Sequence, residues 1–210
     1  MLAKGSYSWI GTAILITFAL GYISRALNWP LSIFFKFLFV IGLILTVFFI
    51  IFFRDPDRKP KGDEDDAVSP ADGKVISIRD GTICIFMNIH DVHVNRAPLA
   101  GTVMQIDYKP GGYIPAFNKD SQVNERNHVV INTESGNIEL TQIAGVLTRR
   151  IVSYISEGSR VNRGERIGMI RFGSRLDVKI PHVYEFTVGW NDKVKAGETI
   201  IAMKKEKIRR

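Results

Sequence analysis

The stretch Lys74-Val-Ile-Ser-Ile78, followed after Arg79-Asp80-Gly81 by Thr82-Ile-Cys-Ile-Phe-Met87, is typical of two short strands separated by a glycine-bearing break. Further short runs of this kind follow: Gly101–Tyr108, His128–Asn132, Ile138–Ile143, Arg149–Ser153, Ile167–Arg171, Leu176–Ile180 and His182–Val188. Many short strands with turn signals between them predict a mainly β domain, a compact sandwich or barrel.

A repeated pattern supports this fold class. The stretches Val161-Asn-Arg-Gly164-Glu165-Arg-Ile167 and Val194-Lys-Ala-Gly197-Glu198-Thr-Ile200 share the spacing V-x-x-G-E-x-I. Each places a glycine in a tight turn before a strand, where a positive φ costs glycine little. Such turns also recur in biotinyl- and lipoyl-like folded sheets, so the repeat favours that β architecture and is silent on catalysis.

Two apolar segments precede the β-rich region, Ile10–Ala26 and Leu31–Phe53. About 20 residues at ~1.5 Å rise per residue cross a ~30 Å hydrocarbon core, so the second segment is long enough and the first is marginal. Their short connection predicts a tight helical hairpin. Basic residues before the first and after the second helix predict both chain ends in the cytoplasm. A cleaved signal peptide is the alternative, but a small-residue cleavage site is lacking.

We therefore expect three regions: a membrane anchor of two helices over residues 1–54, a polar linker over 55–68, and a β domain over 69–210. The linker contains Asp55-Pro-Asp-Arg-Lys-Pro-Lys-Gly-Asp-Glu-Asp-Asp66, which has proline and glycine but no large apolar residue. Such a composition is typical of a tether between a membrane and a folded domain.

The charge and cysteine content narrow the possible partners. A formal net charge of +7 favours an anionic partner, and the apolar segments make anionic lipid the simplest choice. Nucleic acid is not expected, because the β-rich region shows no stripe of Lys or Arg interleaved with aromatic residues. Cys84 is the only cysteine, so an internal disulfide is excluded, and its apolar surroundings predict a small buried thiol.

Three motifs contain residues that could carry chemistry. His90 and His93 form His-x-x-His, a spacing that helical metal sites use. Their surroundings are typical of a strand and turn, and a convincing third ligand is lacking, so we expect no metal. The other two motifs are Ser69-Pro-Ala-Asp-Gly-Lys74 and Arg171-Phe-Gly-Ser-Arg175. Each is common by itself, and their combination behind a membrane anchor is what points to a function.

Together these pieces resemble the phosphatidylserine decarboxylase family, in its short form. The matching stretches are Phe-Phe-Arg-Asp-Pro at 52–56, Ser-Pro-Ala-Asp-Gly at 69–73, Asp-Val-His-Val-Asn-Arg-Ala-Pro at 91–98, and Gly-Glu-Arg-Ile-Gly-Met-Ile-Arg-Phe-Gly-Ser at 164–174. The resemblance runs from about Arg54 to the C-terminus. Their order and spacing are more specific than any single stretch.

In that family the serine of the Gly-Ser pair becomes a pyruvoyl group. The resemblance therefore implies self-cleavage between Gly173 and Ser174, giving fragments 1–173 and 174–210 that stay together as a heterodimer. The new ketone condenses with the substrate's amine and accepts electrons as CO2 leaves, the role of pyridoxal phosphate elsewhere. The implied reaction of this catalytic β domain converts phosphatidylserine, or an archaeal-type lipid with the same head group, to the ethanolamine lipid.

Self-cleavage requires a base for the Ser174 hydroxyl, and a histidine oriented by a carboxylate is a common solution. The resemblance carries these roles to Asp72 and His93. Longer family members have Asp-x-His-x-x-His and use the second histidine, which aligns with Arg96 here, whereas His93 matches the first. Either His93 takes the base role or this short form matures differently. Arg96 is a candidate to bind the lipid phosphate or the substrate carboxylate, with a structural ion pair as the alternative.

Two other functions compete with the decarboxylase. A membrane-tethered, biotinyl-like adaptor would account for the anchor and the V-x-x-G turns, but it predicts an uncut chain and long helical segments for docking. A membrane-bound metallohydrolase around His90 and His93 would need a third ligand from His128, His182 or an acidic residue. For the decarboxylase, the expected partners are a phospholipid substrate and the chain's own second fragment. A further oligomer is also compatible with the sequence.

Overall fold

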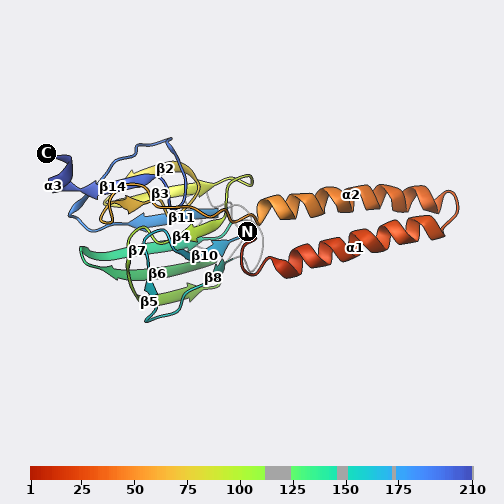
Figure 1. Ribbon diagram of the computed structural model, residues 1–210, viewed down its shortest axis with the longest axis horizontal. Helices are drawn as coiled ribbons and strands as arrows, with labels where there is room; N and C mark the ends of the chain where they lie inside the picture. The colour runs from red at the N-terminus through yellow and green to blue at the C-terminus, as the bar shows by residue number, and fades with distance from the viewer. Residues whose placement is uncertain (112–123, 146–150, 172–173, 210) are drawn as a thin grey trace. The chain divides into compact units, whose positions relative to one another are not determined.

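Two compact units make up the computed structural model of the chain, Met1–Pro56 and Asp57–Arg210 (Figure 1). The structure describes residues 1–111, 124–145, 151–171 and 174–209. Within these ranges the first unit is helical and the second is mainly β. The fold class expected from the sequence, a β domain preceded by two apolar helices, is therefore confirmed.

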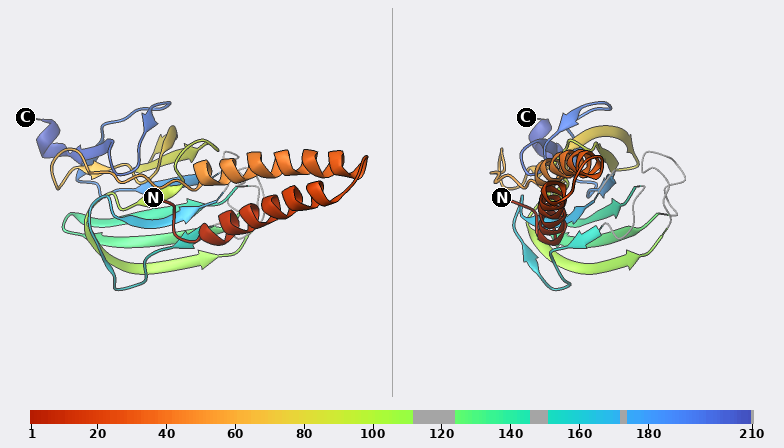
Figure 2. Two further views of the ribbon diagram at one scale, coloured as in Figure 1. Left: turned by 45° about the vertical axis from the view of Figure 1, so that its right-hand side comes forward. Right: turned by 90° about the vertical axis from the view of Figure 1, so that its right-hand side faces the viewer.

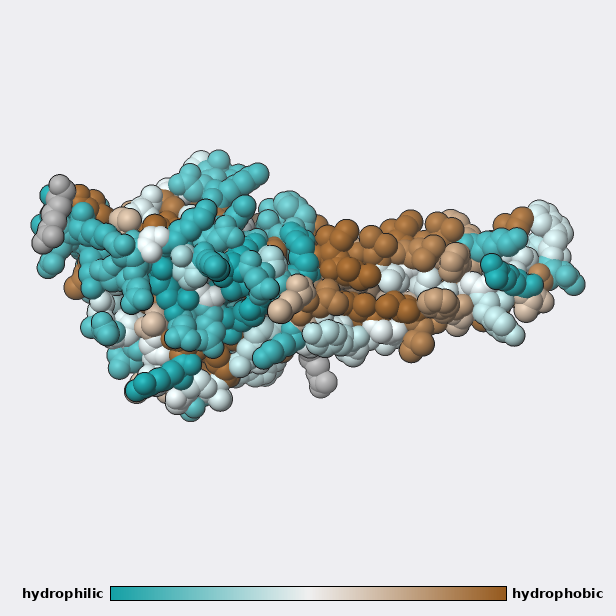
Figure 3. All heavy atoms as spheres, in the orientation of Figure 1, coloured by the Kyte–Doolittle hydropathy of each residue, from teal (hydrophilic) through white to brown (hydrophobic). Residues whose placement is uncertain are grey.

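The first unit is a hairpin of two helices, α1 (Tyr7–Ala26) and α2 (Leu31–Phe52). Their lengths of 20 and 22 residues match a ~30 Å hydrocarbon core at ~1.5 Å rise per residue. Large apolar side chains cover much of their outer surface (Figure 3). Between the helices, the hydroxyl oxygens of Thr17 and Thr46 lie 3.2 Å apart. Both helices are long and apolar enough to cross a membrane.

The two ends of this hairpin lie side by side. The Ala3 amide donates to the Phe53 carbonyl at 2.9 Å, and the Asp55 amide donates to the Met1 carbonyl at 2.8 Å. The start of the chain and the exit of α2 are thus held together. If the hairpin crosses a bilayer, both ends emerge on the same side.

The second unit contains one large sheet, curled into a half-barrel, and two small ones (Figure 2). The large sheet has the order β13 (Lys193–Val194), β2 (Gly73–Arg79), β3 (Thr82–Met87), β11 (Ser174–Lys179), β7 (Gly136–Ile143), β6 (Arg126–Thr133), β5 (Gly101–Lys109) and β9 (Arg160–Val161). The small sheets are β1 (Ala67–Val68), β14 (Ile200–Lys204) and β12 (Tyr184–Phe186), and β4 (Val94–Arg96), β10 (Arg166–Ile170) and β8 (Ile151–Ser153). A short helix, α3 (Lys205–Ile208), follows β14.

Side-chain alternation along the strands builds the core. In β3 the residues Ile83, Ile85 and Met87 are buried, while the residues between them are partly exposed. The same alternation buries Leu176 and Val178 in β11. Because successive side chains of a strand point to opposite faces, this pattern places one face of the curled sheet inside.

The first hairpin of the sheet is the one with the plainest sequence signal. Arg79 pairs with Thr82, so a two-residue loop of Asp80 and Gly81 joins β2 to β3. Both loop residues have positive φ, 50° and 72°, as the Asp-Gly hairpin turn requires. Gly164 and Gly197, the glycines of the repeated V-x-x-G pattern, also have positive φ, 77° and 70°. A biotinyl- or lipoyl-like arrangement of the sheets stays a prediction.

The segment expected to be a tether packs against the β unit over much of its length. The Asp66 carboxylate is buried, and the Arg163 guanidinium donates to the Asp66 carbonyl at 2.6 Å. The Tyr184 hydroxyl donates to the Asp65 carbonyl at 2.9 Å. Ala67 and Val68, placed in the linker from the sequence, form β1. Its polarity suggested a free linker, but charged side chains can pack by pairing with partners distant in sequence.

Candidate active site

The strand register brings the sequence motifs to one end of the large sheet. Ser174 is the first residue of β11 and pairs with Met87, the last residue of β3. The next strand, β2, begins at Gly73 beside the same end of β3, since Lys74 pairs with Phe86. Met87 and Ser174 from two neighbouring strands, and Asp72 directly before the third, therefore lie at the same sheet end.

Ser174 faces the interior. Its side chain is fully buried, and its hydroxyl donates to the Met87 sulfur at 3.9 Å. A thioether is a weak acceptor, so this contact orients the hydroxyl without binding it strongly. Gly173, the other residue of the expected cleavage site, lies outside the described residues.

His93 lies directly before β4 and is buried. Its Nδ1 is 2.9 Å from the Asp91 carbonyl oxygen. A carbonyl oxygen only accepts, so Nδ1 carries the proton in the neutral ring and Nε2 keeps the lone pair that a base needs. The His93 carbonyl accepts from the Ile170 amide at 3.2 Å. This bond ties His93 to the segment that leads toward Ser174.

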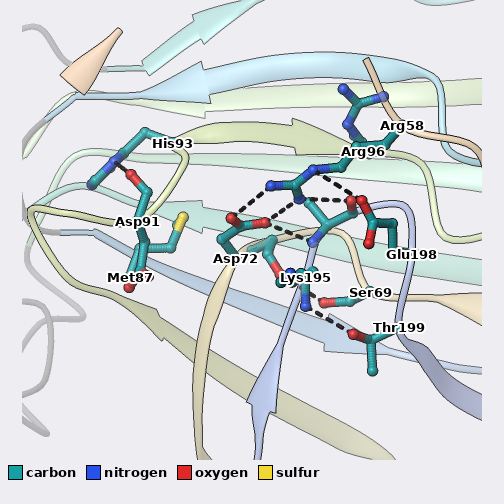
Figure 4. Close-up of polar contacts among 12 residues, drawn as sticks. Arg58, Ser69, Asp72, Met87, Asp91, His93, Arg96, Lys195, Glu198 and Thr199 are labelled. Carbon is teal, nitrogen blue, oxygen red and sulfur yellow. Dashed lines mark hydrogen bonds and ion pairs between the residues drawn. The ribbon is translucent and has the colours of Figure 1, made fainter. Parts of the chain in front are cut away.

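Asp72 is engaged by a different set of groups. The two terminal nitrogens of the Arg58 guanidinium, Nη1 and Nη2, donate to its two carboxylate oxygens, the Nη2–Oδ2 distance being 2.9 Å. The Ala196 amide donates to the same carboxylate at 2.8 Å, and Arg58 reaches Glu198 at 3.5 Å. In Figure 4, Asp72 lies with Arg58 and Glu198, while His93 lies with Asp91 and Met87. The carboxylate that orients His93 in the expected triad is thus replaced, among the described groups, by the Asp91 carbonyl.

Arg96 is also buried rather than exposed to a ligand. Its Nη1 donates to the Gly164 carbonyl at 2.9 Å, and its backbone amide donates to the Pro70 carbonyl at 2.9 Å. These contacts are hydrogen bonds to carbonyl oxygens, so the two alternatives from the sequence, ligand binding and an ion pair, both stay predictions.

The other candidate residues have simpler surroundings. The His90 side chain is 76% exposed, whereas His93 is buried, so the two histidines of His-x-x-His occupy different environments. The pKa of the Cys84 thiol is raised to about 12 by burial and by the nearby Asp177 carboxylate. A thiol with so high a pKa is protonated at neutral pH and is a poor nucleophile.

Several residues of the site carry no motif. Arg58 comes from the expected linker, and Met87 and Gln142 occupy inward positions of strands. Asn95 lies within the quoted stretch 91–98, but the motif gave it no role. A polar residue at an inward position of an alternating run is the one sequence signal that marks Gln142, since Ile138 and Leu140 precede it at the same spacing.

Comparison with known proteins identifies the family of the chain. The phosphatidylserine decarboxylase family model matches residues 45–202, which include most of the β unit. A Methanosarcina mazei protein named as an archaetidylserine decarboxylase proenzyme is 50% identical over 203 residues, covering 96% of each chain. One of the same name from Methanococcoides burtonii is 48% identical over 205 residues, covering 98% of this chain and 97% of its own.

A bacterial protein is similar over a shorter region. The phosphatidylserine decarboxylase proenzyme of Streptomyces coelicolor is 51% identical over 155 residues, covering 71% of this chain and 70% of its own. The family match spans Asp72, His93 and Ser174, the residues on which the sequence motifs depend. With relatives of about half identity aligned over nearly the whole chain, this protein belongs to the phosphatidylserine decarboxylase family.

Proposed function

We propose that the protein is a membrane-bound decarboxylase of serine phospholipids, made as a proenzyme that cuts itself between Gly173 and Ser174. The observation that carries the proposal is the place of Ser174: buried, at the first position of a central strand, within the region that the family model matches. The archaetidylserine and phosphatidylserine of the relatives' names share a phosphoserine head group, which we propose as the substrate's reacting part.

The surroundings of Ser174 fit a pyruvoyl group derived from it. Residue 174 would begin the second fragment, and β11 is paired with β3 on one side and β7 on the other, so the new chain end stays anchored. The buried position keeps bulk water from a reactive ketone. Such a group supplies a carbonyl that condenses with the substrate's amine and takes up the electrons left when CO2 departs.

The chain's own groups support the self-cleavage. The Ser174 oxygen attacks the Gly173 carbonyl carbon, the peptide C–N bond breaks, and an ester forms as the nitrogen gains a proton. Loss of the Cα proton of residue 174 then breaks the Cβ–O bond and releases the Gly173 carboxylate, which leaves a dehydroalanine. Hydrolysis of the dehydroalanine releases its nitrogen as ammonia and leaves the ketone. His93 is our proposed base for the hydroxyl proton, because the Asp91 carbonyl fixes the tautomer that leaves Nε2 free of a proton.

Asp72 supports the site from a distance in this proposal. Its carboxylate joins Arg58 and the Ala196 amide, and the turn that contains Ala196 is held to Ser69, whose carbonyl accepts from Gly197 at 2.6 Å. We therefore infer that Asp72 positions the start of β2, next to the end of β3, and acts on Ser174 through that contact.

The helical hairpin suits an enzyme whose substrate and product both stay in a bilayer. We propose that the β unit lies on the cytoplasmic side, because Lys4 precedes α1 and Arg54, Arg58, Lys59 and Lys61 follow α2. The partners proposed are the phospholipid and the complementary fragment of the same chain.

The first test is the intact mass of the purified protein under denaturing conditions, beside a Ser174→Ala variant. We expect two wild-type fragments that break after Gly173, a carbonyl at the start of the shorter one, and an uncut variant. A single full-length chain in both samples would contradict the proposal and favour the adaptor function.

The second test is turnover with vesicles that contain phosphatidylserine or archaetidylserine, followed by release of CO2 and appearance of the ethanolamine lipid. Wild-type protein should convert at least one of the two lipids, and Ser174→Ala neither. The His93→Gln variant should cut itself about 100-fold more slowly or worse, since a positioned base contributes roughly 10²–10⁴ in rate. Cleavage at the wild-type rate would remove His93 from the mechanism.

A further inference from the structure

Three carboxamides form a chain of hydrogen bonds inside the β unit. The Asn127 Nδ2 donates to the Gln142 Oε1 at 3.0 Å, and the Gln142 Nε2 donates to the Asn95 Oδ1 at 2.8 Å. All three side chains are at most 2% exposed. They come from β6, β7 and β4, so the chain links the large sheet to a small one.

The row of hydrogen-bonded amides ends at Met87, the residue that accepts from the Ser174 hydroxyl. The Asn95 Nδ2 donates to the Met87 sulfur at 3.7 Å, and the same sulfur accepts from the Ser174 hydroxyl at 3.9 Å. Each amide accepts through its oxygen and donates through its nitrogen, so the direction of every bond is fixed from Asn127 to Met87. The Met87 sulfur is therefore both the end of the amide chain and the acceptor for the Ser174 hydroxyl.

The surrounding backbone leaves room for these amides. Gly168 of β10 pairs with Asn95, and a Cβ added at Gly168 would lie 2.7 Å from the Val152 carbonyl oxygen and 3.1 Å from the Gln142 Nε2, so the glycine accommodates both β8 and the amide. A buried amide is costly unless its hydrogen bonds are made, whereas apolar groups of the same shape would fill this space at little cost. Stability alone therefore gives no reason for three amides at this place, beside an equally buried serine.

We propose that Asn95, held by Gln142 and Asn127, is a positioning residue for the self-cleavage at Ser174, acting through Met87. The inference rests on the proposed function. The Met87 sulfur holds the hydroxyl hydrogen in one direction, which turns the oxygen lone pairs away from the sulfur. Because a thioether accepts weakly, the hydrogen passes to a base at little cost, whereas a carbonyl in this place would retain it.

The test separates this role from a structural one by removing all three hydrogen-bonded amides at once. The variant Asn95→Leu/Gln142→Met/Asn127→Leu replaces each amide with an apolar side chain of similar size, so none of the three partners is left unsatisfied. We expect a melting temperature close to that of the wild type, and self-cleavage slowed about tenfold or more, because small misplacements of reacting groups reduce rates by up to about 100-fold. Cleavage is followed by pulse–chase synthesis in the presence of lipid nanodiscs.

Two further variants complete the test. Val178→Ala truncates a buried residue at the far end of β11 and should lower the melting temperature while leaving the cleavage rate unchanged. Met87→Leu conserves volume but removes the sulfur acceptor, and it should slow cleavage even if the triple variant does not fold. Wild-type rates in the triple variant, or in Met87→Leu where the triple variant is unfolded, would overturn the inference. A wild-type chain that stays uncut would instead overturn the proposed function.

Discussion

At the scale of single residues, Arg58 and Asp72 form a largely buried ion pair in the described site. Both side chains are about one-tenth exposed, at 8% and 11%. Such a pair is a weak source of net stability when intact, but removing one partner leaves the other charge buried and uncompensated.

We expect Arg58→Met to destabilise the β unit by about 3 kcal/mol or more, because the Asp72 carboxylate loses its guanidinium partner. The double variant Arg58→Met/Asp72→Asn should be less destabilised than Arg58→Met alone. The measurement is thermal unfolding of the full chain in detergent, followed by circular dichroism in the β region. Lys59→Met, which changes an exposed neighbour, is the control. An equal loss of stability in Lys59→Met and Arg58→Met would contradict the prediction.

The sequence marks Asp72, His93 and Ser174 as candidates, but it could not predict their contacts. Arg58 lies in a stretch whose composition predicts a tether, and only the fold brings its guanidinium to Asp72. The same holds for Asn95 and Gln142, which are 47 residues apart in the chain and meet because two sheets face each other. Motifs mark reactive residue types, whereas hydrogen-bond partners between distant strands depend on register and packing.

At the scale of secondary-structure elements, the start of β2 tolerates little change. Gly73 has a φ of +143°, and a Cβ there would collide with the Phe86 carbonyl oxygen of the neighbouring strand. Gly158 also has a positive φ, +80°, but nothing lies within 4 Å of its added Cβ. Substitutions at the two glycines therefore distinguish the cost of backbone strain from the cost of a steric collision.

We expect Gly158→Ala to lower stability by about 1 kcal/mol, the cost of a left-handed conformation for an L-residue. Gly73→Ala should cost more than about 3 kcal/mol, since the backbone of β3 must also move away. Unfolding midpoints of the two variants, measured side by side, test this difference. Equal midpoints would show that the sheet end accommodates a side chain at Gly73.

Lys207 ties the short helix α3 to the Asp63–Asp66 segment. Lys207 Nζ contacts the carboxylates of Asp63 and Asp66, the latter at 2.6 Å. Hydrogen bonds to these two aspartates, with their charges, raise the pKa of Lys207 above its ordinary value of 10.5. A folded-state pKa above the unfolded value stabilises the protein fully below the unfolded pKa, and this contribution is lost as pH rises through the folded pKa.

We therefore expect the wild type to lose stability relative to Lys207→Met as the pH rises above about 10.4, the unfolded lysine value. Below that pH the difference between the two proteins should be constant. Denaturant midpoints at pH 8, 9, 10, 11 and 12 provide the measurement. A difference that does not change through this range would mean that the pKa of Lys207 is the same in the folded and the unfolded protein.

The elements themselves were predicted unevenly, for physical reasons. The strands β3 and β5 were placed almost to the residue, since alternation and glycine turns are local signals. The two- and three-residue strands β1, β4, β9 and β13 were not predicted, whereas β8 and β12, of three residues each, lie within longer predicted runs. Segments this short carry too few side chains for a period to appear, and they form strands because a longer partner offers them hydrogen bonds.

At the scale of the whole molecule, the hairpin of α1 and α2 places both of its ends on one side. Cysteine labelling tests which side that is. In a Cys84→Ser background, we expect a membrane-impermeant maleimide to label Asn28→Cys, in the turn between the helices, in right-side-out vesicles. Lys61→Cys should react only after the vesicles are opened. The reverse pattern would place the β unit outside, and labelling of both would mean that one helix does not cross.

The order of strands in the large sheet has a consequence for the lifetime of the enzyme. β11 belongs to the proposed short fragment, yet it lies between β3 and β7 of the long one. Folding of the uncut chain is a unimolecular process, whereas reassembly after cleavage needs two chains to meet, at a rate that falls with dilution. If the chain is cut as we propose, the precursor renatures as one molecule, whereas the two fragments must first meet before the sheet can form again.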